Sequence, residues 1–325
     1  MKLKKVWAML VLPFAMAAAT GLAHAAYPEH VIKIVAPYSA GGSSDLIARI
    51  IGDQLGAELG QPVVVENKPG AGSMLGTAYV AQSKPDGYTL LLADVPFTIV
   101  PALYAGRLEY DPKKDFVPLA LIGQSPMYLF VKKDFQADTV KKLVDMAKAS
   151  PGRITFGSGG NGSLTHMMGE LFMQKTDTKL VHVPYKGAAA SISGLAGGQI
   201  DISFSSMPSA AAIYEAKRIV PIAVSAPERN PATPDVPTLM ESGVPDMAIQ
   251  SWWGLMVPKG TPAEALKALE AAMQKVLKME GVREKLARLA VAPPSETDAA
   301  ALGRFLQADF GRWEQLVKDA NISIQ

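Results

Sequence analysis

Cysteine is absent from this 325-residue sequence, and histidine occurs only four times. The lack of cysteine excludes disulfides, thiol nucleophiles, cysteine-ligated zinc and iron–sulfur clusters. The sequence also has no G-x-S-x-G nucleophile elbow and no G-x-x-x-x-G-K-[ST] phosphate loop. His166 and Glu170 stand four residues apart, a spacing that metal pairs use, but no third ligand accompanies them. We therefore expect no catalytic residues, no metal and no cofactor.

An excess of either charge is also missing. Lysine and arginine total 32, against 30 aspartate and glutamate residues. Three of the lysines lie within the first five residues, so the rest of the chain is close to neutral and slightly acidic. Nucleic acid and anionic membrane surfaces both demand a basic field. Neither is expected as a partner.

The N-terminus has the pattern of a secretory signal peptide at 1–25. A basic start is followed by an apolar run from Val6 to Ala19 and by the cleavage pattern Ala23-His24-Ala25. The alternative is a membrane anchor, but the run is short for that, and Pro13 and Gly21 interrupt it. We expect export to the periplasm with cleavage near Ala25.

Short runs rich in Val, Ile and Leu alternate with helical periodicity, which predicts an α/β fold with mostly parallel sheets. Strands are expected at 31–38, 62–69, 88–94, 116–123, 127–133, 154–159, 180–186, 200–206, 219–226 and 252–259. Helices are expected at 44–60, 139–149, 164–175, 188–196, 262–279, 282–289 and 297–320.

Two candidate crossovers, at Gln124-Ser125-Pro126 and near Gln250-Ser251, divide these elements into two lobes. Lobe I would contain residues 26–125 and 250–325, and lobe II residues 126–249. This topology is that of a type II periplasmic binding protein, a Venus flytrap with its ligand at the carboxyl ends of the strands.

Two glycine-rich loops, in 34–49 and 155–172, each join a strand to a helix. A helix start leaves backbone N–H groups unpaired and carries partial positive charge, so such loops suit an anion. The ordinary alternative is a strand-to-helix turn with a hydroxyl cap, or, for the histidine, a surface capping residue. Candidate ligand contacts are Ser39, Gly41, Gly42 and Ser43 in the first loop, and Asn161, Gly162, Ser163, Thr165 and His166 in the second.

Four further candidates lie at or just after the ends of other strands. Asp94 ends the third strand, where it would accept a hydrogen bond from a ligand amine or hydroxyl, or would cap a following turn. Phe97 would floor the pocket or belong to the core. Ser205 ends a lobe II strand as a possible donor, and a helix is expected to follow from Ala210. Lys186, in a strand-to-helix turn, would steer anions or simply be solvated.

The sequence resembles the Bug family, the extracytoplasmic solute receptors of tripartite tricarboxylate transporters. The resemblance rests on segments that run in order through the chain: YPEHVIKIVAPYSAGGSSDLIAR, GQPVVVENKPGAGSMLG, PDGYTLLLAD, GNGSLTHMMGELF, VHVPYKGAAASISGLAGGQIDISF, PDVPTLMESGVP and SWWGLMVPKGTP. It implies a flytrap that closes on one small organic acid. The family's loop contacts would fall on Tyr38 to Ser43, including Ala40, and on Asn161 to His166.

Three departures from the family pattern bear on the ligand: Ser39-Ala40 in place of two prolines, Asp94 to Phe97 in place of small hydroxyl residues, and Ser205 in place of an aspartate. We therefore expect a carboxylate ligand whose other end donates to Asp94, and an Asp94→Asn variant tests this. The implied partners are the large and small membrane subunits of the transporter, and a monomer is expected. The alternatives are a receptor for a membrane signalling sensor and, more distantly, a secreted hydrolase using Ser163 and His166.

Overall fold

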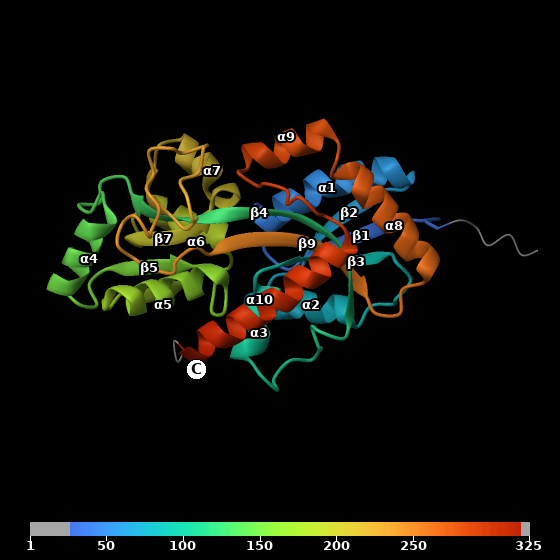
Figure 1. Cartoon of the computed structure of the whole chain (residues 1–325), viewed down its shortest axis with the longest axis horizontal. Helices are drawn as coiled ribbons and strands as arrows, with labels where there is room; N and C mark the ends of the chain where they lie inside the picture. The colour runs from blue at the N-terminus through green and yellow to red at the C-terminus, as the bar shows by residue number, and fades with distance from the viewer. Residues whose placement is uncertain (1–26, 320–325) are drawn as a thin grey trace, which may run out of the picture.

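The computed structural model describes residues 27–319, so the signal peptide predicted at 1–25 lies outside the described residues. Helices lie on both sides of a curled sheet (Figure 1). The strands are β1 (Ile32–Ala36), β2 (Val63–Asn67), β3 (Thr89–Asp94), β4 (Phe116–Lys132), β5 (Thr155–Ser158), β6 (Val181–Pro184), β7 (Ile202–Ser206), β8 (Ile219–Val224) and β9 (Gln250–Pro258). The helices are α1 (Ser43–Leu59), α2 (Met74–Ala81), α3 (Pro96–Leu103), α4 (Val140–Ala149), α5 (Leu164–Thr176), α6 (Ala188–Ala196), α7 (Met207–Glu215), α8 (Ala263–Val276), α9 (Glu280–Arg288) and α10 (Ala299–Asp319), with a 3-10 turn η1 (Ala71–Ser73).

The strands follow the order β2-β1-β3-β9-β4-β7-β5-β6, and β8 also pairs with β4. Toward the two ends of the sheet the pairs are parallel: β1 with β2 and β3, and β5 with β6 and β7. In the middle, β9 and β4 pair antiparallel with their neighbours. The predicted α/β class is confirmed, and the sheet as a whole is mixed because the strands that cross between its halves run antiparallel.

The long strand β4 corrects one prediction. Two strands were expected on either side of Gln124-Ser125-Pro126, whereas the structure has a single strand. From Phe116 to Pro126 it pairs with β9, and from Met127 onward it pairs with β7 and β8. Pro126 is accommodated because it stands where β4 changes partners, so the N–H that it lacks costs little. We place the boundary between the proposed lobes, 26–125 with 250–325 and 126–249, at this change of partner.

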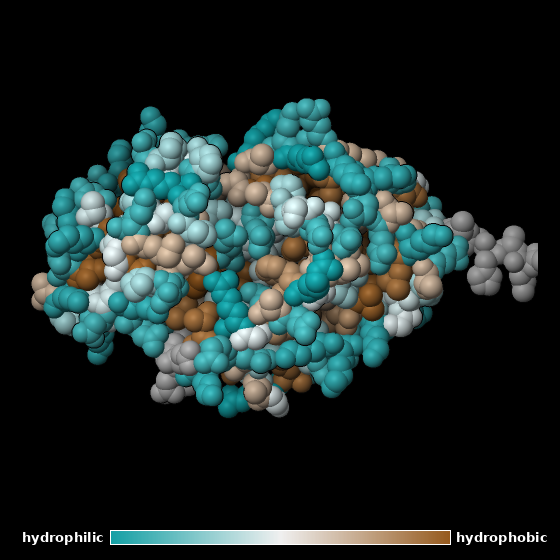
Figure 2. Space-filling model, in the orientation of Figure 1, coloured by the Kyte–Doolittle hydropathy of each residue, from teal (hydrophilic) through white to brown (hydrophobic). Residues whose placement is uncertain are grey.

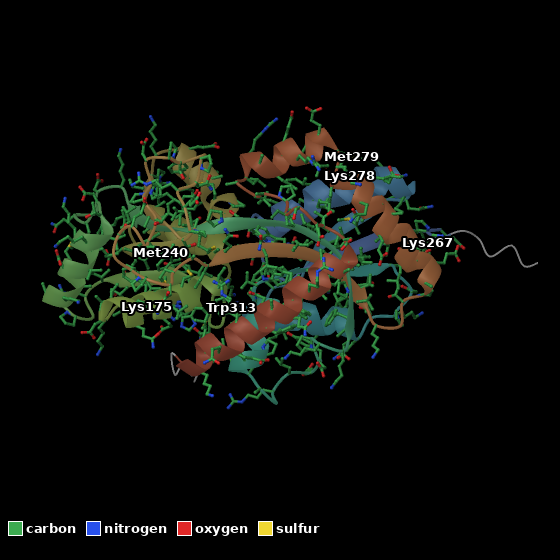
Figure 3. All side chains as sticks on the ribbon, viewed as in Figure 1. Lys175, Met240, Lys267, Lys278, Met279 and Trp313 are labelled. Carbon is green, nitrogen blue, oxygen red and sulfur yellow. The ribbon has the colours of Figure 1, made fainter. Side chains whose placement is uncertain are left out.

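The helices pack through the apolar stripes that predicted them. In α1, the side chains of Ile47, Ile51 and Leu55 lie four residues apart and are fully buried. The helix ends at Gly60, whose φ of 70° is the left-handed conformation that glycine supplies at a helix C-terminus. In α8, Lys267 points outward (Figure 3). Helices α1 and α8 therefore cover the sheet with one face and meet solvent with the other.

Helices α2 and α3 were not expected from the sequence. The segment after Asp94, which resembles a turn, instead enters α3 with Pro96 in its first turn. Proline is favoured there because the first helical N–H groups have no intrahelical acceptor. Asp94 is therefore the last residue of β3, directly ahead of a helix.

The surface in Figure 2 is mainly hydrophilic, with hydrophobic residues scattered among the polar ones. Among residues 27–319, no helix has both the length and the hydropathy needed to span a bilayer.

Candidate functional site

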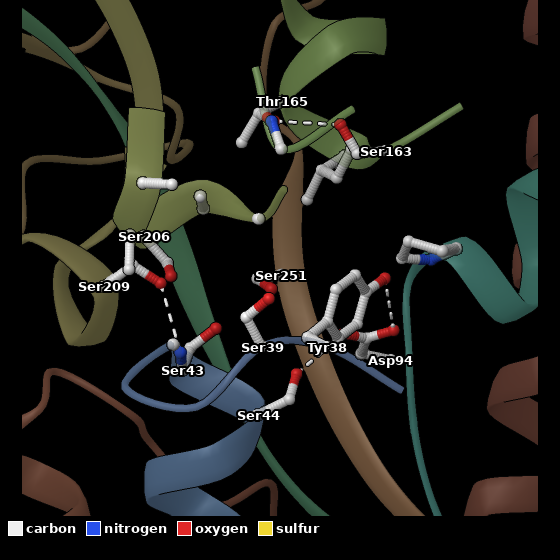
Figure 4. Close-up of a pocket in the computed structure, with 18 of the residues that line it drawn as sticks. Tyr38, Ser39, Ser43, Ser44, Asp94, Ser163, Thr165, Ser206, Ser209 and Ser251 are labelled. Carbon is white, nitrogen blue, oxygen red and sulfur yellow. Dashed lines mark hydrogen bonds between the residues drawn. The ribbon is translucent and has the colours of Figure 1, made fainter. Parts of the chain in front are cut away.

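A cavity of about 320 Å³ lies where the two proposed lobes meet. Figure 4 shows Tyr38 and Asp94 on one side of it and Ser163 and Thr165 on the other. Its polar lining is rich in hydroxyl groups and contains only two charged side chains among the described residues, Asp94 and Lys186. The lining residues with polar side chains are Tyr38, Ser39, Ser43, Ser44, Asp94, Ser163, Thr165, Lys186, Ser193, Ser206, Ser209 and Ser251.

The first predicted loop reaches the cavity through Tyr38, Ser39, Ala40, Gly42 and Ser43. Gly42 is the N-cap of α1, with an extended backbone and no capping side chain. The tip of the loop is Gly41, whose φ of 83° requires glycine-like freedom. The N–H of Gly41 donates to Asp45 at 2.9 Å and does not face the cavity. The loop therefore brings the N-terminus of α1, which has no capping side chain, to the cavity.

The second predicted loop is held by its own hydroxyls. Ser163 caps α5 by accepting from the N–H of His166 at 3.3 Å, and Thr165 accepts from the N–H of Gly159 at 2.7 Å. The two hydroxyl oxygens are 3.0 Å apart. Whichever hydroxyl donates to the other, the second keeps a free proton. Because both residues line the cavity, that proton can serve a ligand.

The start of α6 is also part of the site, although the sequence did not predict it. Gly187, Ala188, Ala189 and Ala190 all line the cavity. Gly187 caps the helix without a side-chain hydrogen bond, and within residues 27–319 no group accepts from the N–H groups of the three alanines. Glycine followed by small residues at a helix start is a signal for close anion approach, but no hydroxyl accompanied it.

Ser206 and Ser209, at the start of α7, also line the cavity. The predicted Ser205 does not: it is fully buried, and its hydroxyl bonds to the backbone oxygen of Ser206. Side chains alternate along a strand, so the residue next to the predicted one takes the position. Ser209 Oγ accepts from the N–H of Ser43 at 3.2 Å, which links α7 of lobe II to α1 of lobe I.

Asp94 is a buried acid on the lobe I wall, with only 8% of its surface exposed. Each carboxyl oxygen accepts one hydrogen bond from a hydroxyl: Oδ1 from Tyr38 at 3.2 Å and Oδ2 from Ser44 at 2.8 Å. Ser44 in turn accepts from the indole N–H of Trp253 at 3.3 Å. Burial raises the pKa of Asp94 to about 7, although both hydroxyl hydrogen bonds favour the charged form.

The remaining predicted residues lie outside the cavity lining. Phe97 is core, packed edge-on to Phe116 at 5.3 Å between ring centroids, because α3 turns its side chain away from the cavity. Asn161 is exposed on the loop, and the N–H of the buried Gly162 donates to His166 Nδ1 at 3.3 Å. His166 therefore supports the second loop from behind.

The second histidine is stacked behind the same loop. His182 lies between Phe156 and His166, at centroid distances of 4.8 and 4.2 Å, and its Nε2 is 2.6 Å from Ser158 Oγ. Ser158 is fully buried and does not line the cavity, so this serine–histidine pair cannot reach a substrate there. In residues 27–319 no three metal-ligating side chains gather in one place.

The half-buried imidazole of His182 predicts an acid-sensitive fold. Burial, and secondarily His166, lowers the pKa of His182 to about 4, so between pH 6.5 and 4 only the unfolded chain takes up this proton. Stability is present above that window and is lost as pH falls through it. The full displacement corresponds to about 3 kcal/mol, which we reduce to about 1–2 kcal/mol because the ring is only half-buried.

The His182→Gln variant keeps a hydrogen-bonding side chain but cannot titrate. From pH 7 to pH 4, we expect the free energy of unfolding to fall by about 1–2 kcal/mol more in the parent than in this variant. Urea denaturation at both pH values measures this difference. Parallel pH profiles for parent and variant would contradict it.

The two proposed lobes also come close to each other at Gly72 and Asn161, outside the cavity lining. A Cβ built on Gly72, in η1, would lie 2.8 Å from the backbone oxygen of Asn161. Gly70, Ala71, Gly72 and Ser73 all have positive φ, so the chain enters this contact through a run of left-handed residues. This contact and the hydrogen bond from Ser43 to Ser209 both join residues that we assign to different lobes.

Comparison with known proteins gives one consistent result. Residues 47–322 match the family described as tripartite tricarboxylate transporter family receptor. The solved structure of the periplasmic binding protein BugD is similar, with 31% identity, a TM-score of 0.88, and coverage of 92% of this chain and 100% of BugD.

Two further similar structures come from Rhodopseudomonas palustris and contain ligands. Rpa4515 with adipate has 30% identity and a TM-score of 0.87, covering 91% of this chain and 99% of that one. MatC with bound malate has 29% identity and a TM-score of 0.85, covering 90% and 100%.

Proposed function

The chain belongs to the tripartite tricarboxylate transporter receptor family, whose members are periplasmic solute-binding receptors and not enzymes, and we propose that it captures one small carboxylate between its lobes and delivers it to such a transporter. The cavity described above is the capture site. The membrane subunits of the transporter would receive the ligand from the closed form. Residues 1–25 would direct export to the periplasm.

The observation that carries this proposal is the convergence of helix starts on the cavity. Five helices, α1, α3, α5, α6 and α7, begin at its wall, and residues of each first turn or cap line it. Each start carries roughly half a positive charge. Among the described residues no arginine lines the cavity, so backbone dipoles and hydroxyl protons would neutralise the ligand.

The unpaired N–H groups support a more specific position for the carboxylate. Those of Ala188, Ala189 and Ala190 have no acceptor among the described residues, and the hydroxyl pair of Ser163 and Thr165 keeps one free proton beside them. We propose that the carboxylate lies between the starts of α5 and α6, in lobe II. Lys186, exposed at the rim, would attract the anion from solution.

The size of the cavity supports a small ligand. Its volume of about 320 Å³ is at the lower end of the range for ligand pockets. Adipate and malate occupy the similar proteins Rpa4515 and MatC. A ligand held by lobe II N–H groups and by lobe I side chains binds the closed form better than the open one, and so drives closure.

Native mass spectrometry of the protein purified from its periplasm tests the proposal. We expect one small organic acid per chain, released on denaturation, and stabilisation by the same acid in a thermal-shift screen. A protein that arrives empty and is not stabilised by any mono-, di- or tricarboxylate or amino acid would contradict carboxylate capture.

A further inference from the structure

The lobe I wall of the cavity carries a buried acid that a carboxylate receptor does not need. Asp94 lies on that wall, across the cavity from Ser163 and Thr165, beside which we place the ligand carboxylate (Figure 4). A carboxylate here repels an acidic ligand and loses solvation. Such a group selects among ligands, because it must be matched or neutralised when the site closes.

The hydrogen bonds around Asp94 determine whether this end of the cavity offers donors or acceptors to a ligand. Tyr38 and Ser44 both donate their hydroxyl protons to it, at 3.2 and 2.8 Å. The proton of Tyr38 is then committed, so its oxygen offers only lone pairs to the cavity. An ionised Asp94 therefore gives this end of the cavity acceptors: its own oxygens and that of Tyr38.

We propose that Asp94 selects the second polar group of the ligand: ionised, it requires a hydrogen-bond donor such as an ammonium or hydroxyl group, and a second carboxylate enters only when Asp94 has taken up a proton. This inference rests on the proposed function. The proton comes from solvent and remains bound to the Asp94 carboxyl, which then donates a hydrogen bond to the ligand or to Tyr38. Tyr38 can then turn its own proton toward the ligand.

The surroundings of Asp94 allow this titration. Burial raises the pKa of Asp94 to about 7, so both forms are populated near neutral pH. The titratable groups that face it are the phenols of Tyr38 and, behind Tyr38, Tyr110; burial raises both of their pKa values, so they stay neutral. Lys186 belongs to the lobe II side of the lining. A bound second carboxylate would raise the pKa of Asp94 further, and an ammonium group would lower it.

Calorimetric titration with length-matched probes tests the proposal. The probes are adipate, 6-aminohexanoate and 6-hydroxyhexanoate, together with their shorter homologues. From pH 6 to pH 8, we expect the affinity for the dicarboxylate to fall about tenfold and that for the amino acid to rise about tenfold, because the fraction of protonated Asp94 falls by that factor across its pKa. The hydroxy acid should change little, since a hydroxyl both donates and accepts.

The control is Asp94→Asn, which keeps the size of the side chain but cannot titrate. This variant removes a buried ionisable group, so we expect it to fold. The affinities for the dicarboxylate and for the amino acid should then no longer change with pH. Titration in two buffers of different ionisation enthalpy adds a second readout: at pH 8, uptake of close to one proton per dicarboxylate bound by the parent, and none by the variant.

The outcomes separate this inference from the proposed function. Dicarboxylate binding by the parent without proton uptake at pH 8, or slopes that survive in Asp94→Asn, would overturn the role of Asp94 and leave the receptor in place. If no probe of any length binds to parent or variant, carboxylate capture itself fails, and the role of Asp94 fails with it.

Discussion

Replacing Ala188 with proline is expected to weaken carboxylate binding about ten- to hundredfold, the loss of one hydrogen bond to a charged group. Ala188 is the first residue of α6 and follows Gly187, whose ψ of 157° suits a residue before proline. Proline at the first helical position costs the helix little, because that N–H has no intrahelical acceptor. The substitution therefore removes a ligand donor from the cavity at little cost to the helix, provided that the proline ring fits beside Gly159, on which a Cβ would lie 3.0 Å from the Ala188 nitrogen.

Glu280→Pro is the matched control for this variant. Glu280 is the exposed first residue of α9, and its predecessor Met279 has a ψ of 126°, also suited to proline. It does not line the cavity. Calorimetry with the acid identified by mass spectrometry should show normal affinity for Glu280→Pro and a loss for Ala188→Pro at equal thermal stability. Equal affinities would move the carboxylate away from α6.

Local patterns in the sequence indicated where the two loops lie, because each places glycines and hydroxyls directly after an apolar strand, but Gly41, Asn161, Gly162 and His166 do not line the cavity. Ser43 and Ser163 stand at or next to helix starts on the cavity, as those patterns indicated. Helix α6 was predicted with the bounds that the structure shows. Its place in the cavity was not predicted, because Gly187 and the alanines carry no side-chain donor to draw attention to them.

The partners of the other site residues could not be predicted, because they come from segments that are distant in the sequence. Asp94 meets Tyr38 and Ser44 because β3 pairs with β1 in parallel, which brings the carboxyl ends of the two strands together. The sequence placed Asp94 at the rim but could not supply these partners. His166 and His182 meet for the same reason, through the pairing of β5 with β6. That stack explains why His166 supports the loop instead of facing the cavity.

Single-residue errors came from side-chain direction. Ser205 and Phe97 lie beside residues that line the cavity, Ser206 and Pro96, but their own side chains are buried. The direction at the end of a strand depends on the residue at which the following helix begins. Since α3 was not expected and the start of α7 was expected too late, these directions could not be assigned.

A methyl group on Gly72 should act as a wedge between the lobes. In the closed structure its Cβ would stand 2.8 Å from the backbone oxygen of Asn161, closer than such contacts are tolerated. Overpacking of this kind costs about 1–3 kcal/mol, and here the cost falls on closure. We expect Gly72→Ala to lose roughly tenfold or more in ligand affinity, with the loss mainly in faster release, because the open form has no such clash.

Gly106→Ala separates the wedge from backbone strain. Gly106 has a φ of 74°, close to the 63° of Gly72, but nothing lies within 4 Å of a Cβ built on it. Both alanines thus bear a left-handed backbone, and only one meets the other lobe. Stopped-flow release and calorimetry should give normal ligand kinetics for Gly106→Ala, while the two variants unfold at similar temperatures without ligand. If Gly72→Ala also binds normally, the contact with Asn161 does not belong to the ligand-holding state, and closure must be completed elsewhere along the cavity, with the bond between Ser43 and Ser209 as the next candidate.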